Sequence, residues 1–413
     1  MSHAATVPLP STPTITAEHW SGRPTIAVID LDAHASNLRV TRSLIGPHVK
    51  LMAVVKANAY GHGAVILGES AIATGADELA VATVDEGAQL RDAGIEAPIL
   101  VLGPIGAGER TRAIGQGLAV VVSDSGFAHA LAADAKLMLA KDPVSVHLKI
   151  DTGMNRFGTS PDLAVATAKA ILSHPELRLD GIMTHMAAAD DPDPHFEHDQ
   201  ATIFDRVLAD LADAGIEIPS QHVANTATTL RFRHDHRSRV RVGIGQYGLQ
   251  PDPAMALPGP FRRIMTVHSR IARIHEIHPG DGVSYGFRYR ADHDELTALV
   301  PIGYGDGLRR NLSPFMWMGV GGMQAPVAGR ICMDQTVVRL PAGVSAQTGD
   351  VVTVIGNGSE ETASAPTFDD LAALSETISY ELTCGLEPRL PRLYVRGGEV
   401  VAIADLTGIR KFT

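Results

Sequence analysis

Eight short strand-like runs, several of them apolar throughout, alternate with helical stretches between residues 51 and 244, and this alternation constrains the fold more than any other feature. A run that is apolar throughout is typical of a strand buried on both faces. The predicted strands are Leu51–Val55, Leu79–Thr83, Ile99–Leu102, Ala119–Val122, Val144–Ile150, Asp180–His185, Ser220–Ala224 and Val240–Ile244. Alternating strands and helices indicate parallel βαβ units, and eight units favour an α/β fold of the closed (β/α)8 (TIM-like) barrel type. An open doubly wound sheet is the alternative, but the GxGxxG fingerprint it favours does not follow the first strand.

A second, mostly β domain is predicted from about Phe261, where strand-like runs replace the alternation. These runs are Met265–Ile277, Leu296–Ile302, Pro326–Leu340, Val351–Ile355 and Val400–Ala404, with one helix at Thr367–Leu374. The predicted domains are therefore a barrel at residues 23–260 and a β domain at 261–413. Residues 1–22, rich in Pro, Thr and Ser, are expected to form a flexible N-terminal extension. Thr25–Ile29 has no place among the eight barrel strands, so we expect it to pair with the β domain.

The composition argues against several classes of partner. The net charge is −11 and no basic block occurs, which argues against nucleic acid and anionic membranes as partners. No stretch approaches the ~20 apolar residues of a membrane span. Two cysteines, Cys332 and Cys384, cannot build a disulfide framework, so a reducing cytoplasm is the expected compartment. No metal site is predicted.

Lys56 directly follows the first barrel strand and is the main candidate for chemistry. The polar and glycine residues after it are typical of a loop before a helix. Ligands bind at the carboxyl ends of parallel strands in α/β folds. A partly desolvated lysine there has a lowered pKa and is suited to form a Schiff base. A lysine that merely extends from the strand end into solvent is the structural alternative.

Other chemically useful residues follow the ends of later strands, so they are expected on the same face of the barrel. They are Arg156 after the fifth strand, His185 at the end of the sixth, Asn225 and Thr226 after the seventh, and Arg241, Gly243 and Ile244 in the eighth. Loops after strands seven and eight of such barrels commonly bind a phosphate group. The sequence therefore predicts a site for a phosphorylated cofactor near Lys56.

Residues 54–63, VVKANAYGHG, resemble the pyridoxal-phosphate lysine segment of the alanine racemase family. Further stretches match the family pattern in order, from Arg23 to Leu393. The resemblance implies that Lys56 holds pyridoxal 5'-phosphate as a Schiff base. It implies a cofactor site made of Lys56, Tyr60, His185, Asn225, Thr226, Arg241, Gly243, Ile244 and Tyr380. Thr226 stands where serine is common in the family, and its hydroxyl can serve the same purpose.

Arg241 faces the pyridine nitrogen of the cofactor by this resemblance, and His185 would hydrogen-bond and orient it. A guanidinium cannot accept a proton, so it keeps the ring nitrogen unprotonated. The ring is then a weaker electron sink, which favours proton return at Cα over decarboxylation or transamination.

The substrate-binding residues implied by the resemblance are Arg156, which suits a substrate carboxylate, and Met333, through its backbone. Asn155 departs from the family, where glycine is common, and this change is expected to affect loop stiffness. Lys149 occupies a position that can be carbamylated in the family, which would make it an anion that holds Arg156. A buried lysine needs a partner or a modification.

Tyr285, in Val283–Gly286, is the second acid–base residue by resemblance, and it would reach the site of a partner subunit. Racemisation needs one base on each face of Cα, and an amine opposite a phenol provides them. The expected assembly is a homodimer with two composite sites. The expected reaction interconverts L-alanine and D-alanine, and D-alanine would supply peptidoglycan.

Three alternative functions stay open on the sequence. A decarboxylase of the same barrel fold would require a carboxylate where Arg241 stands. A broad-specificity amino-acid racemase would use the same machinery with a wider pocket near Tyr285 and Met333. A non-catalytic carrier of pyridoxal phosphate usually lacks the second domain in this fold.

Overall fold

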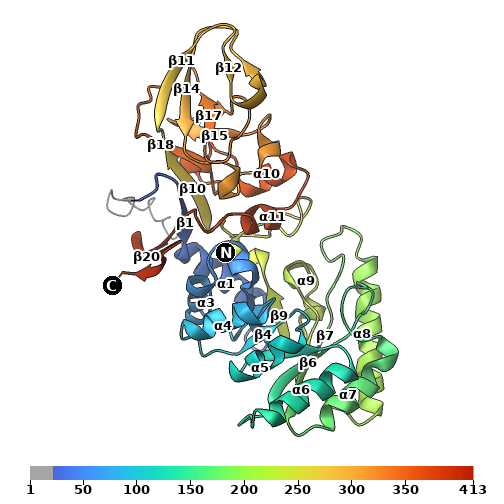
Figure 1. The fold of residues 1–413 in the computed structure, drawn as a ribbon. Helices are drawn as coiled ribbons and strands as arrows, with labels where there is room; N and C mark the ends of the chain where they lie inside the picture. Colours follow the sequence, from blue (N-terminus) through green and yellow to red (C-terminus); the bar gives the residue numbers. More distant parts are fainter. Residues whose placement is uncertain (1–21, 413) are drawn as a thin grey trace. The chain divides into compact units, whose positions relative to one another are not determined.

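In the computed structural model, which describes residues 22–412, the chain forms two compact units (Figure 1). The barrel unit is Ala35–Phe261, and the β unit combines residues 22–34 with the chain from Arg262 onward. The expected N-terminal extension, residues 1–22, lies outside the described residues except for Gly22. Within the described part, no helix has both the length and the apolar character needed to cross a bilayer.

The barrel unit is built on the eight parallel strands that the sequence predicts. They are β2 (Lys50–Val54), β3 (Glu78–Val81), β4 (Ile99–Val101), β5 (Ala119–Val122), β6 (Val144–Lys149), β7 (Leu177–Met183), β8 (Gln221–His222) and β9 (Arg239–Val242). Neighbours pair in chain order from β2 to β8, and β9 pairs with β2. Between β8 and β9 the amide of Arg241 donates to the Ala224 carbonyl at 2.9 Å, and that of Ser238 donates to the Gln221 carbonyl at 3.2 Å. These two bonds close the circle of strands.

Helices follow the strands, and Figure 1 shows α3 to α8 around the sheet. The helices are α1 (Leu31–Ile45), which carries the chain into the barrel unit, α3 (Ala64–Ala73), α4 (Val84–Asp92), α5 (Ala107–Gly115), α6 (Ser125–Leu137), α7 (Ala164–Leu172), α8 (His195–Asp213) and α9 (Thr226–Arg231). Side chains cap several of these helix starts. The hydroxyl of Thr83 accepts from the Glu86 amide in a capping box on α4, and Asp124 accepts from the Phe127 amide on α6 at 2.7 Å.

Burial explains why most of the barrel strands can be predicted from the sequence. Every residue of β3, β4 and β9 is buried, as expected for strands covered on both faces. Strand β7 differs from its prediction, Asp180–His185, because it starts three residues earlier and ends two earlier. Its first half alternates buried Leu177 and Leu179 with exposed Arg178, which is not a continuous apolar run. His185 therefore lies beyond the strand end.

The β unit contains three sheets. Its strands are β1 (Ile26–Asp30), β10 (Met265–Arg270), β11 (Arg273–Ile277), β12 (Gly282–Val283), β13 (Tyr289–Arg290), β14 (Glu295–Val300), β15 (Trp317–Val320), β16 (Met323–Pro326), β17 (Thr336–Arg339), β18 (Val351–Ile355), β19 (Arg392–Arg396), β20 (Glu399–Asp405) and β21 (Gly408–Lys411). The largest sheet has the order β16-β15-β18-β10-β1-β19-β20-β21, and β11-β14-β17 and β12-β13 form the others. Strand β1 lies antiparallel to β10 and parallel to β19.

Three expectations for this region are wrong in detail. The run Met265–Ile277 is two strands, β10 and β11, which belong to different sheets. The run Pro326–Leu340 is mostly a loop, with strand only at its two ends. Gly329 interrupts it with a left-handed φ of +73°, where a Cβ would lie 2.4 Å from the Val283 carbonyl. Besides helix α10 (Phe368–Leu374), a second helix occurs, α11 (Ser379–Cys384).

Candidate active site

Lys56 begins a left-handed turn, α2 (Lys56–Tyr60), at the carboxyl end of β2. Ala57, Asn58 and Ala59 have φ of 50–53° and ψ of 48–51°, and Tyr60 has φ 53°. Each non-glycine residue in this conformation costs roughly 1–2 kcal/mol, so the turn needs support from its surroundings. The sequence predicts only a loop here, and the turn is a finding of the structure.

Hydrogen bonds from outside the turn supply this support. The Glu86 carboxylate accepts from the Ala57 amide at 2.6 Å, and the Asn58 side chain accepts from the Ala64 amide at 2.9 Å. The turn thereby joins β2 to α3 and fixes the direction in which Lys56 leaves the strand. The Lys56 side chain is half-buried, and its Nζ lies 6.0 Å from the centre of the Tyr60 ring.

Arg241 is the most tightly held charged group of the barrel. It is 3 % exposed, and its terminal nitrogens donate to the carbonyls of His222, Thr184 and Val223 at 2.9–3.0 Å. The same nitrogens lie 3.3 Å from His185 Nδ1 and 3.2 Å from His222 Nδ1. Burial lowers the pKa of the guanidinium, but these five acceptors favour its charged form. No described residue accepts a hydrogen bond from its Nε, so this donor is available for a ligand.

Arg241 fixes the tautomers of both histidines because a guanidinium only donates. Burial, followed by nearby positive charge, lowers the pKa of His185 and of His222 well below the usual value, so both rings are neutral. Their Nδ1 atoms accept, which places the proton of each on Nε2. His222 Nε2 then donates to His147 Nδ1 at 2.8 Å. A Cβ on Gly181 would lie 2.4 Å from this His147 atom, so only glycine leaves room for the ring.

His222 is the residue that the sequence reasoning did not identify. It lies in β8, three residues before the predicted Asn225, and is fully buried between Arg241 and His147. Its complete burial inside a strand is the property that could have identified it. The sequence of a two-residue strand does not show which of its residues is buried.

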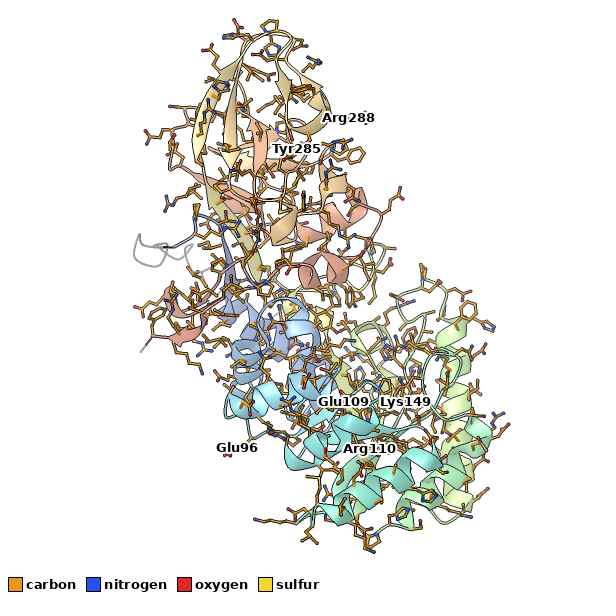
Figure 2. The ribbon with its side chains drawn as sticks, in the orientation of Figure 1. Glu96, Glu109, Arg110, Lys149, Tyr285 and Arg288 are labelled. Atoms are coloured by element: carbon orange, nitrogen blue, oxygen red, sulfur yellow. The ribbon has the colours of Figure 1, made fainter. Side chains whose placement is uncertain are left out.

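Lys149 ends β6 inside a group of positive charges. Its side chain is 5 % exposed, and its Nζ lies 4.7 Å from the centre of the Phe157 ring. Burial, and then the charges of Arg156, Arg241 and Lys56, lower its pKa to about 8. Figure 2 marks this residue in the barrel unit. Four cationic side chains within electrostatic reach of one another favour an anionic ligand at this end of the barrel.

A close-packed cradle lies at the ends of β8 and β9. The Thr226 hydroxyl accepts from the Gly243 amide at 3.0 Å, and Asn225 caps α9 by accepting from the Thr228 amide at 3.0 Å. A Cβ on Gly243 would lie 2.4 Å from the Tyr60 hydroxyl oxygen. The structure thus brings Tyr60, Thr226 and Gly243 together, with the hydroxyls of Tyr60 and Thr226 next to the main chain of a glycine, and Asn225 and Ile244 are the neighbours of Thr226 and Gly243 in sequence.

Arg156 lies on an exposed loop after β6, and hydrogen bonds to the Asp151 side chain hold the conformation of this loop. The Asp151 carboxylate accepts from the amides of Gly153 and Asn155 at 3.1 and 3.0 Å. Asn155 has φ 53°, which explains why glycine suits this position and why asparagine is tolerated. A Cβ on Gly158 would lie 2.7 Å from the Asp151 amide nitrogen, so the loop closes on itself.

We expect Asn155→Gly to change the free energy of unfolding by less than about 0.5 kcal/mol, because glycine adopts the left-handed conformation readily. Asn155→Val is expected to lower it by roughly 1–2 kcal/mol, since a β-branched residue resists this conformation. Urea unfolding of both variants measures the difference. Equal free energies of unfolding for the glycine and valine variants would contradict the importance of the left-handed conformation at residue 155.

The remaining predicted residues lie in the β unit. Tyr285 follows β12 and is 67 % exposed, and it is labelled with Arg288 in Figure 2. Met333 is 52 % exposed, and its carbonyl accepts from the Gly305 amide at 2.8 Å. Tyr285 and Met333 line the same cavity of about 540 Å³. Tyr380 lies on α11 and is half-buried. Within this unit the structure brings Tyr285 and Met333 together.

Comparisons with known proteins place the chain in one family. The sequence model of the alanine racemase N-terminal domain matches residues 29–251, and that of the alanine racemase C-terminal domain matches residues 264–394. An alanine racemase of Nostoc sp. is 39 % identical over 377 residues, which cover 91 % of this chain and 97 % of the relative. An alanine racemase of Geobacillus stearothermophilus is 39 % identical over 389 residues, covering 94 % and 97 %.

Solved structures give the same result. The alanine racemase of Bacillus anthracis, with bound L-Ala-P, has a TM-score of 0.86 and 34 % identity, and the match covers 94 % of this chain and 98 % of that one. The histidine racemase of Leuconostoc mesenteroides has a TM-score of 0.82 and 28 % identity, covering 91 % and 98 %. Both domains, the relatives and the fold confirm the resemblance seen in the sequence, and the chain belongs to the alanine racemase family.

Proposed function

We propose that this protein interconverts L-alanine and D-alanine with pyridoxal 5'-phosphate bound at Lys56. The supporting observation is Arg241, which is buried at the carboxyl end of the barrel with one donor nitrogen left for a ligand. Together with membership of the family, this donor favours proton transfer at Cα over the other reactions of the cofactor.

The residues of the barrel fit such a cofactor in three ways. Lys56 supplies an amine at the strand end, and the cradle of Tyr60, Thr226 and Gly243 suits a phosphate group. Arg241 Nε suits a ring nitrogen. When bound, the cofactor withdraws electrons from Cα and makes its proton acidic. His185, Asn225 and Ile244 complete the barrel side of the proposed site, and Tyr380 is proposed to reach the phosphate.

Arg241 sets the strength of this withdrawal. The guanidinium has no lone pair, so a ring nitrogen facing it stays unprotonated. Its terminal nitrogens are held by three carbonyls and two neutral histidines, so it cannot turn away. With such a cofactor bound, an Arg241 held in this way would favour return of the proton to Cα over other reactions.

Two bases on opposite faces then carry out the inversion. We assign Lys56 Nζ to the α-proton of D-alanine and the Tyr285 hydroxyl to that of L-alanine, each returning a proton to the opposite enantiomer. Arg156 binds the substrate carboxylate, and the Met333 main chain contacts the substrate. Tyr285 and Met333 are proposed to come from the partner subunit of a homodimer.

A chiral assay of the cofactor-loaded protein tests the function. L-alanine, L-serine and L-lysine are each supplied, and the enantiomers, carbon dioxide and amines are measured. D-alanine without carbon dioxide supports the proposal. Carbon dioxide release would assign a decarboxylase, and no product from any substrate, despite a bound cofactor, would assign a carrier.

A broad-specificity racemase is the second candidate, and the similarity to a histidine racemase favours it. Turnover of L-serine, L-lysine or L-histidine at rates within about tenfold of L-alanine would support this candidate. Family membership at 39 % identity to alanine racemases favours alanine.

Subunit complementation tests the shared site. Lys56→Ala and Tyr285→Phe homodimers are each expected to be inactive, whereas a heterodimer of the two contains one site with both native residues. Mixing, denaturing and refolding equal amounts, followed by the racemisation assay, measures the recovery. We expect about one quarter of wild-type activity, since half of the dimers carry one native site of two. Heterodimers that form but stay inactive would contradict the shared site.

Lys149 is proposed to carry a carbamate that neutralises part of the positive charge and holds Arg156. Its pKa of about 8 leaves about one amine in ten neutral at pH 7, against about one in 3,000 at the ordinary value of 10.5. The neutral amine is the form that reacts with carbon dioxide, so modification is expected to rise between pH 6 and 9.

Carbon-13 NMR in labelled bicarbonate measures the carbamate. Lys149→Met is expected to lose the carbamate resonance, and Lys136→Met, on α6, is the control that keeps it. A resonance unchanged in Lys149→Met would contradict the assignment. As the physiological role we propose D-alanine supply for peptidoglycan in the cytoplasm, consistent with Cys332 and Cys384, neither of which is in a disulfide in the described part of the chain.

A further inference from the structure

The turn that carries Tyr285 has an unusual backbone. Ser284 has φ 60° and ψ −173°, a region that essentially only glycine adopts without strain. Gly286 and Phe287 also have positive φ, of 72° and 44°. Glycine adopts positive φ freely, but Ser284 and Phe287 are in conformations that the surrounding structure must enforce.

The Ser284 side chain makes two contacts that enforce it. Its hydroxyl donates to the Arg330 carbonyl at 2.6 Å, and Cys332 Sγ lies 3.2 Å from the hydroxyl oxygen. The Cys332 thiol also lies 3.5 Å from the Arg330 carbonyl oxygen. Both partners belong to the loop that continues into Met333. Ser284 therefore ties the Tyr285 turn to the other predicted site segment of this unit.

Two glycines allow the turn to pack this closely. A Cβ on Gly282 would lie 2.3 Å from the Phe287 ring, and one on Gly329 would lie 2.4 Å from the Val283 carbonyl. The turn is thus packed on two sides. The Phe287 ring packs on Gly282, and the main chain at Gly329 packs on the Val283 carbonyl.

Tyr285 itself has little to hold it. Its side chain is 67 % exposed, and no residue in the described part of the chain hydrogen-bonds its hydroxyl. The direction of the phenol is set by the main chain before it, which Ser284 fixes. Catalytic groups displaced by about 1 Å lose roughly 100-fold in rate, so this fixation has a measurable consequence.

We propose that Ser284 is a positioning residue for Tyr285, acting through its hydrogen bonds to Arg330 and Cys332. The proposal rests on the function proposed above, in which Tyr285 is the base for L-alanine. Ser284 does not touch the substrate. It fixes the turn so that the phenol is presented in one orientation.

Ser284→Ala and Ser284→Gly provide the test, with exposed Ser345→Ala as the matched control. Alanine removes the hydroxyl and keeps the strained backbone. Glycine removes the hydroxyl and relieves the strain, so it keeps the test valid if the alanine variant folds poorly.

We expect kcat/KM for alanine racemisation to fall about 10- to 100-fold in both Ser284 variants, with KM changed less than about twofold. Lys56, the base assigned to the α-proton of D-alanine, is unchanged in these variants. In D₂O, deuterium incorporation at Cα of D-alanine is therefore expected to stay within about twofold of wild type. Deuterium incorporation into L-alanine should fall together with racemisation. A structural defect of the whole site would reduce incorporation into the two enantiomers equally.

Tyrosine ring NMR provides a readout independent of activity. The Tyr285 resonance is assigned by its loss in Tyr285→Phe, and it is expected to shift or broaden in both Ser284 variants but not in Ser345→Ala. Wild-type kinetics with an unchanged Tyr285 resonance in the Ser284 variants would overturn the proposal, as would an equal loss of deuterium incorporation into D-alanine and L-alanine. If the wild-type protein does not racemise alanine, the proposed function is rejected, but the proposal for Ser284 is not. The NMR result would then still decide whether Ser284 positions the Tyr285 ring.

Discussion

Lys56→Ala is expected to lower alanine racemisation in both directions by roughly 10⁴-fold. The substitution removes both the amine proposed to hold the cofactor and the base for one face of Cα, and base catalysis alone contributes about 10²–10⁴-fold. Microscopic reversibility requires the two directions to fall together. Deuterium incorporation into D-alanine should disappear as well, because no other described side chain is assigned to that face.

Lys50→Ala is the matched control, since Lys50 begins the same strand and lies at the opposite end of the barrel, 3.5 Å from Glu78. It is expected to keep racemisation within about twofold of wild type. The activity is measured by coupled chiral detection of D-alanine, and cofactor content is measured by absorption. Racemisation retained within tenfold in Lys56→Ala would disprove the assigned role.

Arg241→Glu is expected to change the kind of reaction as well as its rate. A carboxylate facing the ring nitrogen favours the protonated ring, which withdraws electrons more strongly and spreads the charge away from Cα. Racemisation should fall by roughly 10²–10³-fold, and pyruvate formed by transamination should rise relative to racemisation. Arg241→Lys, which keeps a cation, is expected to lose rate without this shift in products.

Arg239→Gln is the control for loss of a buried charge in the same strand. Arg239 is 6 % exposed, lies two residues before Arg241 in β9 and pairs with Glu78 at 2.7 Å. Its substitution is expected to lower stability and leave the ratio of pyruvate to D-alanine unchanged. The measurement is pyruvate released per racemisation event. The same ratio in Arg241→Glu as in wild type would contradict the role assigned to the guanidinium.

The sequence is most informative where burial is uniform. Barrel strands such as Ala119–Val122 are predictable because they are apolar throughout, and the fold class follows from the alternation of all eight strands with helices. Prediction is poorer where local pattern and long-range contact disagree. The run Pro326–Leu340 looks like a strand, but Gly329 and its contact with the Val283 carbonyl turn it into a loop.

The candidate site is predicted unevenly for a related reason. Lys56, Thr226 and Arg241 follow from strand ends, so they can be placed on one face of the barrel from the sequence. The left-handed turn after Lys56 cannot, because Ala57 and Ala59 do not favour it and its support comes from Glu86, about thirty residues away. The roles of Tyr285, Met333 and Tyr380 come from family resemblance, since nothing in their local pattern indicates catalysis.

The closure of the barrel has a consequence for how long the protein survives in a cell. Strands β8 and β9 are joined through few main-chain bonds, and one of them comes from the amide of Arg241. The proposed cofactor, bound to the side chain of this residue, would stabilise this seam of the barrel by mass action. Without it, the seam is where local opening, hydrogen exchange and proteolysis should begin. The abundance of the enzyme would then follow the supply of vitamin B6, in addition to any control of its synthesis.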